Sequence, residues 1–249
     1  MSAPEISIYF VLPICGYLLG SIPFAFVIGK LHGVDIRTVG SKNIGATNLG
    51  RTLGKKYFWQ AFLLDAAKGF VPMLVASLYQ AKWRHMLGVT SVGLLGPNMG
   101  YIDLLPSWSP LLTGTACVLG HLFPIWLKFK GGKGVATGFG VVLGFWPLYT
   151  LAGLIGGAFF VFMLMVYRTI SLASMTSSIV FVAAVAYLGM HDLPHLPTSL
   201  PWNQHWPLIA VAALFSLMII LRHRANIARL LKGTEPKIGQ REIDKSKMK

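Results

Sequence analysis

A run of glycines around one lysine, Gly131-Gly132-Lys133-Gly134, is the first candidate for chemistry in this sequence. Adjacent glycines let backbone N–H groups approach an anion, because no side chain intervenes. An apolar segment follows directly, so a helix N-terminus would point at the same place. Lys133 would add a full positive charge for a phosphate. Leu at position 127 and Gly134 after the lysine exclude a Walker A loop. The alternative interpretation is a flexible turn with an interfacial lysine.

A second polar segment, GVDIRTVGSKNIGATNLGRTLGKK (33–56), combines arginines with short hydroxyl and amide side chains. Between glycines it places Arg37, Ser41, Asn43, Thr47, Asn48 and Arg51. This composition suits recognition of a small, polar, anionic molecule. A basic loop that only sets orientation in a membrane is the alternative. That alternative explains the arginines but not the Asn, Ser and Thr residues.

A third polar group is divided between RTISLAS (168–174) and RHRANIARLLKGTEP (222–236). His223 and Asn226 are three residues apart, so they share a face if this segment is helical. Ser171 opens an apolar segment. His223 stands between Arg222 and Arg224, where an interfacial histidine is the competing interpretation.

Several common catalytic patterns are missing from the sequence. It contains no G-x-S-x-G, no H-E-x-x-H and no H-x₄-D pattern, and Asp and Glu total only eight residues. A Ser-His-Asp triad or a carboxylate metal site is therefore hard to assemble. We expect no cofactor and no metal, and a chemistry that depends on anion binding more than on a protein base.

The elements that must position these residues are membrane spans. The 249 residues are 54% hydrophobic and only 12% charged, about half the charged share of a soluble domain. A helix needs about 20 mostly apolar residues to cross a bilayer. The sequence predicts an all-α integral membrane protein with seven transmembrane helices, over 6–29, 57–79, 110–127, 134–149, 150–167, 171–190 and 206–221.

Charge sorts along the chain in register with these spans. Of the 22 Lys and Arg residues, all except Lys68, Lys82 and Arg84 fall in alternate loops or in the C-terminal tail. The positive-inside rule then places the N-terminus outside and the C-terminus in the cytoplasm. A nucleic-acid binder would not sort its charge in this way, which excludes nucleic acid as a partner despite the net charge of +14.

This organisation predicts a single seven-helix domain over 1–233 and a basic cytoplasmic tail over 234–249. The polar segments become cytoplasmic active-site loops at 30–56, 128–134, 168–172 and 222–235. Asp65 and Lys68 lie inside the second span at i, i+3, where they can neutralise each other.

The loop over 191–205 carries several residues of types that bind metals, namely His191, Asp192, His195 and His205. Their spacings match no pair of ligands on a helix face, so we interpret them as solvated loop residues.

Four quoted segments, GSKNIGATNLGR, GHLFPIWLKFKGGKGVATGFG, SLAS and RHRANIARLLKGTE, resemble the acyl-phosphate-dependent glycerol-3-phosphate acyltransferase family (PlsY). The resemblance covers every polar segment in order, on a chain with that family's seven-span layout. One departure is Lys42, at a position that is typically Gly in the family, which leaves the backbone shape of that turn open.

The resemblance implies transfer of a fatty acyl group from acyl phosphate to glycerol 3-phosphate, giving lysophosphatidate and phosphate in the first step of phospholipid synthesis. It implies a bacterial inner membrane, a site on the cytoplasmic side, and a soluble acyl-phosphate synthase as a possible partner. The implied catalytic residues are Ser41, Arg51, Lys133, His223 and Asn226. Those expected at the acyl phosphate are Gly131, Gly132, Lys133, Gly134 and Ser171, and those at glycerol 3-phosphate are Ser41, Asn43, Arg51, Lys133, His223 and Asn226. Glu235 matches an acidic residue that looks structural.

Two other classes of protein compete with this interpretation. A transporter for a phosphorylated solute would use the same basic residues, but it should carry polar groups near the bilayer midplane on broken helices. A structural protein would leave the Gly, Asn and Arg clusters without a purpose. Apart from Asp65 and Lys68 the spans are nearly free of charge, which favours an enzyme at the membrane surface.

Overall fold

The structure is a computed structural model that describes residues 6–86, 108–193, 198–200 and 202–238. Most of the segment between the second and third predicted spans (80–109), His195, and the tail beyond Ile238 lie outside the described residues.

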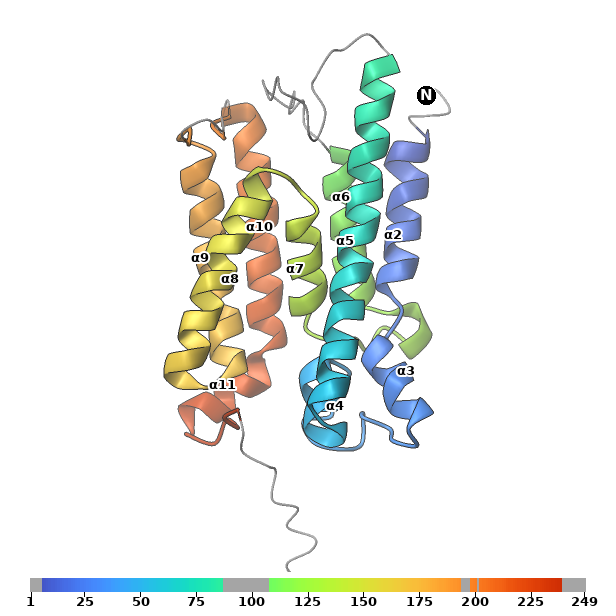
Figure 1. The fold of residues 1–249 in the computed structure, drawn as a ribbon, viewed down its shortest axis with the longest axis vertical. Helices are drawn as coiled ribbons and strands as arrows, with labels where there is room; N and C mark the ends of the chain where they lie inside the picture. Colours follow the sequence, from blue (N-terminus) through green and yellow to red (C-terminus); the bar gives the residue numbers. More distant parts are fainter. Residues whose placement is uncertain (1–5, 87–107, 194–197, 201, 239–249) are drawn as a thin grey trace, which may run out of the picture.

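Within that part of the chain the regular elements are all helices (Figure 1). A short π-helix, Ser7–Val11, runs into α2 (Leu12–Gly20). The next helices are α3 (Phe24–Leu31), α4 (Ala46–Leu53), α5 (Lys55–Met86) and α6 (Trp108–Leu122), followed by a 3-10 turn, Ile125–Leu127. The remaining helices are α7 (Val135–Leu143), α8 (Leu148–Tyr167), α9 (Ile170–Leu188), α10 (Trp202–Arg222) and α11 (Arg224–Leu231).

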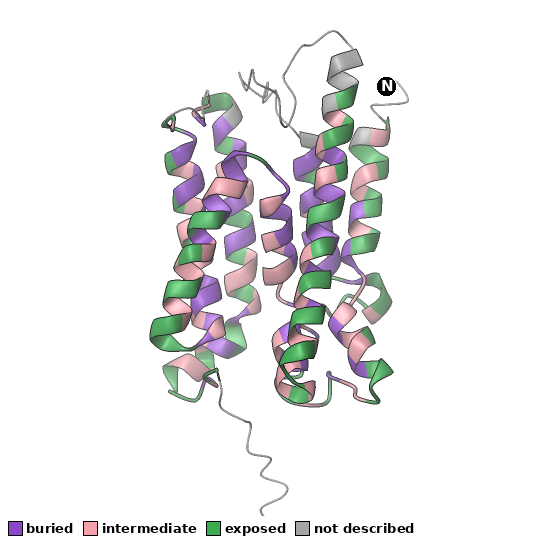
Figure 2. Ribbon diagram, viewed as in Figure 1, coloured by how far each residue is buried: buried purple, intermediate pink, exposed green. Residues whose placement is uncertain are grey.

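Six helical segments in the described ranges are long and apolar enough to cross a membrane. They are Tyr9–Leu31, Lys55–Gln80, Pro110–Leu127, Leu148–Tyr167, Ile170–Leu188 and His205–Arg222. Exposed apolar side chains such as Leu63 on α5 and Met165 on α8 lie on the outward faces of the bundle, and buried residues lie between the helices (Figure 2). In a protein of this composition, such faces meet lipid. The prediction of an all-α integral membrane protein is confirmed.

The segment predicted as the fourth span, 134–149, differs from expectation. Its helix α7 has only nine residues and ends at Gly144, and α8 begins just after Pro147. Nine residues rise about 14 Å, well short of a hydrocarbon core of about 30 Å. A single continuous helix over this segment is therefore incorrect, and a seventh full-length span is not confirmed. Hydrophobicity misled the prediction, because this segment is apolar through burial between other helices.

Helix α7 packs closely against α5 through small residues. A methyl group added at Gly140 would overlap with the carbonyl of Ala66, and one added at Gly69 would overlap with that of Thr137. Glycine at both positions lets the two backbones approach, as is common where helices pack in membranes. Because α7 follows the glycine-rich loop directly, this packing also holds that loop beside α5.

The predicted polar loops lie at one end of the bundle. Figure 1 shows α3, α4 and α11 together at that end, beside the start of α5 and the connection between α8 and α9. Segments far apart in the sequence thus come near one another. This arrangement agrees with the sorting of positive charge seen in the sequence.

The loop before α4 is organised by one buried amide, that of Asn48. Its Oδ1 accepts the N–H of Ser41 at 2.9 Å. Its Nδ2 donates to the carbonyls of Ile36 at 2.8 Å, Asn43 at 2.9 Å and Val39 at 3.2 Å. The side chain is 1% exposed, so these bonds form away from competing water. They fold the loop over 36–43 onto the N-terminal half of α4.

Lys42 has a left-handed backbone conformation within this loop, with φ of 57°. Its N–H donates to the carbonyl of Val39 at 3.0 Å, closing a turn. Glycine adopts this conformation without steric cost, whereas other residues pay about 1 kcal/mol or more. Lys42 therefore occupies a turn whose backbone conformation favours glycine.

We predict that Lys42→Gly is more stable than Lys42→Ala by about 1 kcal/mol, which reverses the usual order of these two residues. Both variants lose the charge, and they differ only in the Cβ atom. Thermal unfolding in detergent should give Lys42→Gly the higher midpoint, by about 2–4 °C. A higher midpoint for Lys42→Ala would show that the turn is not left-handed.

Candidate active site

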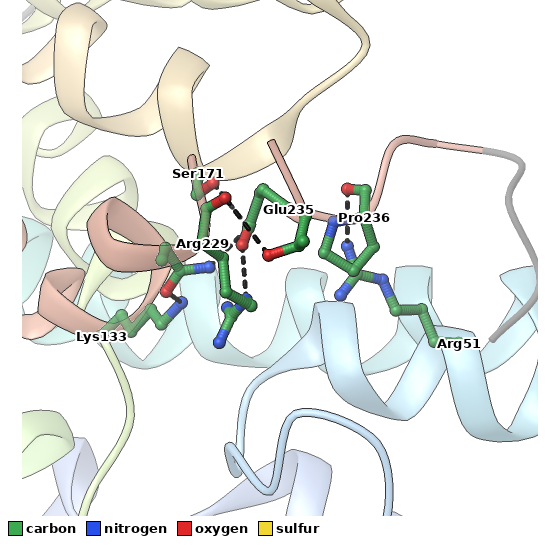
Figure 3. Close-up of polar contacts among 8 residues, drawn as sticks. Arg51, Lys133, Ser171, Arg229, Glu235 and Pro236 are labelled. Carbon is green, nitrogen blue, oxygen red and sulfur yellow. Dashed lines mark hydrogen bonds and ion pairs between the residues drawn. The ribbon is translucent and has the colours of Figure 1, made fainter. Parts of the chain in front are cut away.

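The carboxylate of Glu235 is the centre of a polar network at the basic end of the bundle (Figure 3). Its Oε1 accepts the hydroxyl of Ser171 at 2.7 Å and the amide Nδ2 of Asn226 at 2.6 Å. Its Oε2 accepts Nε of Arg229 at 2.7 Å. These donors lie on α9 and α11. The buried side chain of Glu235 therefore connects α9 and α11 to the segment that follows α11.

The start of the predicted tail is thus part of this network. Glu235 is 9% exposed, and the N–H of Ile238 donates to the carbonyl of Arg168 at 2.7 Å. The first residues of the predicted tail thus contact the connection between α8 and α9 and the start of α9. Composition predicted a basic cytoplasmic tail, because a polar segment taken alone gives no sign of its partners.

Lys133 enters the network from the glycine-rich loop. Its Nζ donates to Oδ1 of Asn226 at 2.5 Å. The amide of Asn226 thus uses its oxygen for Lys133 and its nitrogen for Glu235. A chain of hydrogen bonds runs from Lys133 through Asn226 and Glu235 to Ser171. It links four segments of the chain and fixes the position of the ammonium group.

Arg51, in the last turn of α4, reaches the same region. Its Nη2 donates to the carbonyl of Pro236 at 3.4 Å, at the long limit for a hydrogen bond. Figure 3 shows its guanidinium group directed toward the segment that carries Glu235 and Pro236. Arg51, Lys133 and Arg229 thus place three cations around the single carboxylate of Glu235. The excess positive charge suits a site for an anion.

His223 lies at the N-cap of α11 and is 2% exposed. Its Nδ1 is 2.7 Å from the carbonyl of Ile219. A carbonyl can only accept, so Nδ1 carries the proton and Nε2 is left as an acceptor. Burial, together with the nearby charge of Lys133, lowers the pKa of His223 to about 4. The imidazole is therefore neutral near pH 7.

Burial also lowers the pKa of Lys133, to about 8. The carboxylate of Glu235 opposes this shift, while the charges of Arg229 and Arg51 add to it. The pKa of Glu235 itself is lowered: burial acts to raise it, but the hydrogen bonds from Ser171, Asn226 and Arg229 outweigh burial. At neutral pH the network therefore contains a charged carboxylate and a mostly charged lysine.

The glycines of the loop serve close packing in this structure. The N–H of Gly132 donates to the carbonyl of His121 at 3.1 Å. A methyl group at Gly131 would overlap with that same carbonyl, and one at Gly132 with the ring of His121. Gly134 has φ of 81° and caps α7. The N–H of Gly132 is therefore not free to bind an anion, contrary to the expectation for this loop. The N-terminus of α7, beside Lys133, still offers free N–H groups to an anion.

Ser41 and Asn43 lie at the same end of the bundle, but their contacts are with Asn48 and not with the network around Glu235. Their hydrogen bonds, as far as the structure describes them, are made with Asn48 through the backbone of each residue. The side chain of Ser41 is exposed, so its hydroxyl is open to a ligand. The structure thus brings Ser171, Asn226 and Arg51 into contact with the segment that holds Glu235 and Pro236, and bonds Lys133 to Asn226. It leaves Ser41 and Asn43 on the adjacent loop.

The sequence analysis did not identify two members of the network, Arg229 and the backbone carbonyl of Pro236. Arg229 follows His223 and Asn226 at the same spacing of three, so a helical face shared by all three was a usable signal. The backbone of Pro236 carried no signal. Asn48 stood among the polar residues of its segment, but nothing in the pattern distinguished its role from that of its neighbours.

Of the residues considered for a metal over 191–205, the three that the structure describes have protein partners. His191 and His205 each contact a backbone carbonyl, at 2.9 Å and 3.0 Å. Asp192 accepts two backbone N–H groups of its own loop. His205 lies on α10 and is 1% exposed, so the interpretation as a solvated loop residue is wrong for His205.

Fold and site together define an integral membrane protein with a positively charged polar network at one end of its helices. The family described as glycerol-3-phosphate acyltransferase matches residues 10–233. A glycerol-3-phosphate acyltransferase from Caulobacter vibrioides is 40% identical over 229 residues, covering 91% of this chain and 86% of that protein. One from Anaeromyxobacter dehalogenans is 42% identical over 225 residues, covering 90% and 94%.

Two solved structures share this fold. The crystal structure of PlsY (YgiH), an integral membrane glycerol 3-phosphate acyltransferase, in its glycerol 3-phosphate form has a TM-score of 0.71 at 38% identity, covering 93% of this chain and 96% of that one. Its lysophosphatidic acid form gives 0.67 at the same identity, covering 93% and 95%. This chain belongs to the glycerol-3-phosphate acyltransferase family.

We predict that affinity for glycerol 3-phosphate falls as the pH rises through about 8, because Lys133 then loses its proton and its charge. The dissociation constant should rise by up to about tenfold per pH unit above that point. Titration calorimetry between pH 7 and 10 measures this. In the matched variant Lys133→Arg the guanidinium stays charged, so the same titration should show no alkaline loss. An unchanged wild-type affinity at pH 10 would exclude Lys133 from the anion site.

Proposed function

We propose that this acyltransferase takes its acyl group from acyl phosphate and transfers it to glycerol 3-phosphate. The products are lysophosphatidate and inorganic phosphate. The observation that carries the proposal is the hydrogen-bonded chain from Lys133 through Asn226 to Glu235, with Arg51 and His223 beside it. It supplies two kinds of group that such a reaction needs, namely cations for phosphates and a neutral acceptor for a hydroxyl.

The donor's chemistry explains the small catalytic apparatus. The glycerol 3-phosphate hydroxyl oxygen attacks the carbonyl carbon, and a new C–O ester bond forms. The bond between that carbon and the phosphate oxygen breaks, and phosphate leaves with the electron pair. Because phosphate is a good leaving group, the carbonyl needs orientation and charge stabilisation more than a covalent nucleophile. The hydroxyl of Ser171 is already bonded to Glu235, which fits a positioning role.

The proton of the attacking hydroxyl goes to a substrate phosphate. His223 presents Nε2 as an acceptor, but a pKa of about 4 makes it a weak base. It can accept a hydrogen bond from the hydroxyl and orient it without keeping the proton. A phosphate monoester has its second pKa near 6, so phosphate is the better final acceptor.

The two phosphates take adjacent positions in this proposal. Lys133 and the N-terminus of α7 hold the donor phosphate, with Gly131, Gly132 and Gly134 shaping the loop and Ser171 fixing Glu235. Glycerol 3-phosphate binds between the α4 segment and α11, in contact with Ser41, Asn43, Arg51, His223 and Asn226, while Lys133 bridges to it. The acyl chain extends between helices toward lipid.

Location follows from the charge distribution. The basic loops lie together at one end, and the positive-inside rule assigns such loops to the cytoplasm. We therefore place the site at the cytoplasmic face of a bacterial inner membrane, where a soluble enzyme would supply the acyl phosphate.

The polar groups are distributed as an enzyme requires and not as a transporter requires. A transporter should bind its solute near the bilayer midplane. Here the network around Glu235 lies at one end, and the charges within the spans, Asp65 and Lys68, are paired at 2.7 Å. One experiment separates the two classes. Purified protein in detergent should release phosphate only when long-chain acyl phosphate and glycerol 3-phosphate are both present. Uptake of glycerol 3-phosphate into vesicles without product would indicate transport.

We predict that Lys133→Ala lowers turnover by at least about a hundredfold, because the leaving phosphate loses its charged partner. The matched control is Lys130→Ala, which removes an exposed lysine three residues earlier in the same loop and should keep turnover within about twofold. Phosphate release per mole of monodisperse protein measures both. Comparable turnover in the two variants would refute the role of Lys133.

A further inference from the structure

A buried ion pair within the membrane-spanning part of α5 is not used by the proposed reaction. Nζ of Lys68 lies 2.7 Å from Oδ1 of Asp65, and each side chain is 3% exposed. Nδ1 of His121, on α6, lies 3.8 Å from the same carboxylate oxygen. These three residues form what we term the α5–α6 polar cluster.

Stability alone does not account for this cluster. Charges are costly at membrane depth, and replacing a buried ion pair with apolar side chains is often neutral or stabilising. The residues next to the cluster suggest another purpose, because each of its outer members contacts a segment that leads into the candidate active site.

Lys68 contacts the break between α2 and α3. Its Nζ donates to the carbonyl of Ile22 at 2.7 Å. Ile22 lies between the end of α2 and Pro23, the N-cap of α3. A lysine ammonium commonly satisfies the last carbonyls of a helix in this way. The bend places α3 at the basic end of the bundle (Figure 1), and α3 leads into the loop that carries Ser41.

His121 contacts the glycine-rich loop. Its carbonyl accepts the N–H of Gly132 at 3.1 Å. Its ring lies so close to Gly132 that an added methyl group would overlap with it. Lys133 is the next residue, and its bond to Asn226 depends on where this loop lies. A shift of the imidazole therefore displaces the loop that carries Lys133.

We propose that Asp65, Lys68 and His121 act as positioning residues that hold the Ser41 loop and the Lys133 loop in register with each other. Asp65 holds Lys68 toward Ile22 and faces the imidazole of His121, so one carboxylate influences both loops. This inference rests on the proposed function, because the geometry being held is that of the same site.

The first test is the double variant Asp65→Leu/Lys68→Met. Single variants would leave an unpaired buried charge, whereas the double variant removes both charges together. We expect a monodisperse protein whose kcat falls at least about tenfold, since an ångström of misplacement can cost about a hundredfold in rate. A structural role alone would reduce the yield of folded protein and leave kcat per folded molecule unchanged.

The matched control is Ser178→Ala/Ser216→Ala. These hydroxyls form a buried 2.9 Å contact between α9 and α10, also inside the spans but away from both loops. This variant should keep kcat within about twofold. If Asp65→Leu/Lys68→Met is folded and equally active, the inference is overturned. If the wild-type protein itself releases no phosphate from acyl phosphate and glycerol 3-phosphate, the proposed function fails instead.

A second test keeps the inference falsifiable should the double variant not fold. Gly132→Ala should lower kcat, because its methyl group displaces the loop from His121. Adding His121→Ala removes the ring that the methyl group meets, so the combined variant should be no less active than Gly132→Ala alone. Loss factors that multiply would show that the two positions act independently and would contradict the inference.

Discussion

One carboxylate, that of Glu235, holds the candidate site together. It accepts hydrogen bonds from Ser171, Asn226 and Arg229, and through Asn226 it orients Lys133. A buried carboxylate with this many donors is costly to protonate or to replace. Within the residues that the structure describes, it is one anion among several cations, so it orders them without neutralising them all. In the proposed reaction the remaining positive charge holds the substrate phosphates, which gives an acidic residue a purpose within an anion-binding site.

The bilayer imposes the second constraint. Polar groups within spans must find protein partners, so they are paired, as in the contact between Asp65 and Lys68. The groups that we propose to bind substrate gather at one end. Helix α7 connects the two regions. It is short, packs on α5 through Gly69 and Gly140, and begins directly after Lys133. The core of the bundle therefore sets the position of a loop at its surface.

The sequence was sufficient to predict the six long apolar helices and to show that the basic residues sort into alternate loops, because both follow from composition over long windows. Motif resemblance also indicated the family, which the comparisons then showed. What escaped prediction depends on contacts between distant segments. The length of α7 depends on which neighbours bury it. The amide of Asn48 and the carboxylate of Glu235 resemble other polar residues until their partners are known. Gly131 and Gly132 predicted that another group lies close to this backbone. The sequence did not show that the group is His121.

The claim that four separate segments converge to hold two phosphates is tested most directly by determining the structure with both substrates' groups present. A non-transferable acyl phosphonate and glycerol 3-phosphate would be bound together in lipid. The account predicts the phosphonate within hydrogen-bond distance of Lys133 Nζ, and the glycerol phosphate contacting Arg51 and the α11 segment beside His223. Binding of either ligand at the opposite end of the helices, or away from Lys133 and Arg51, would contradict it.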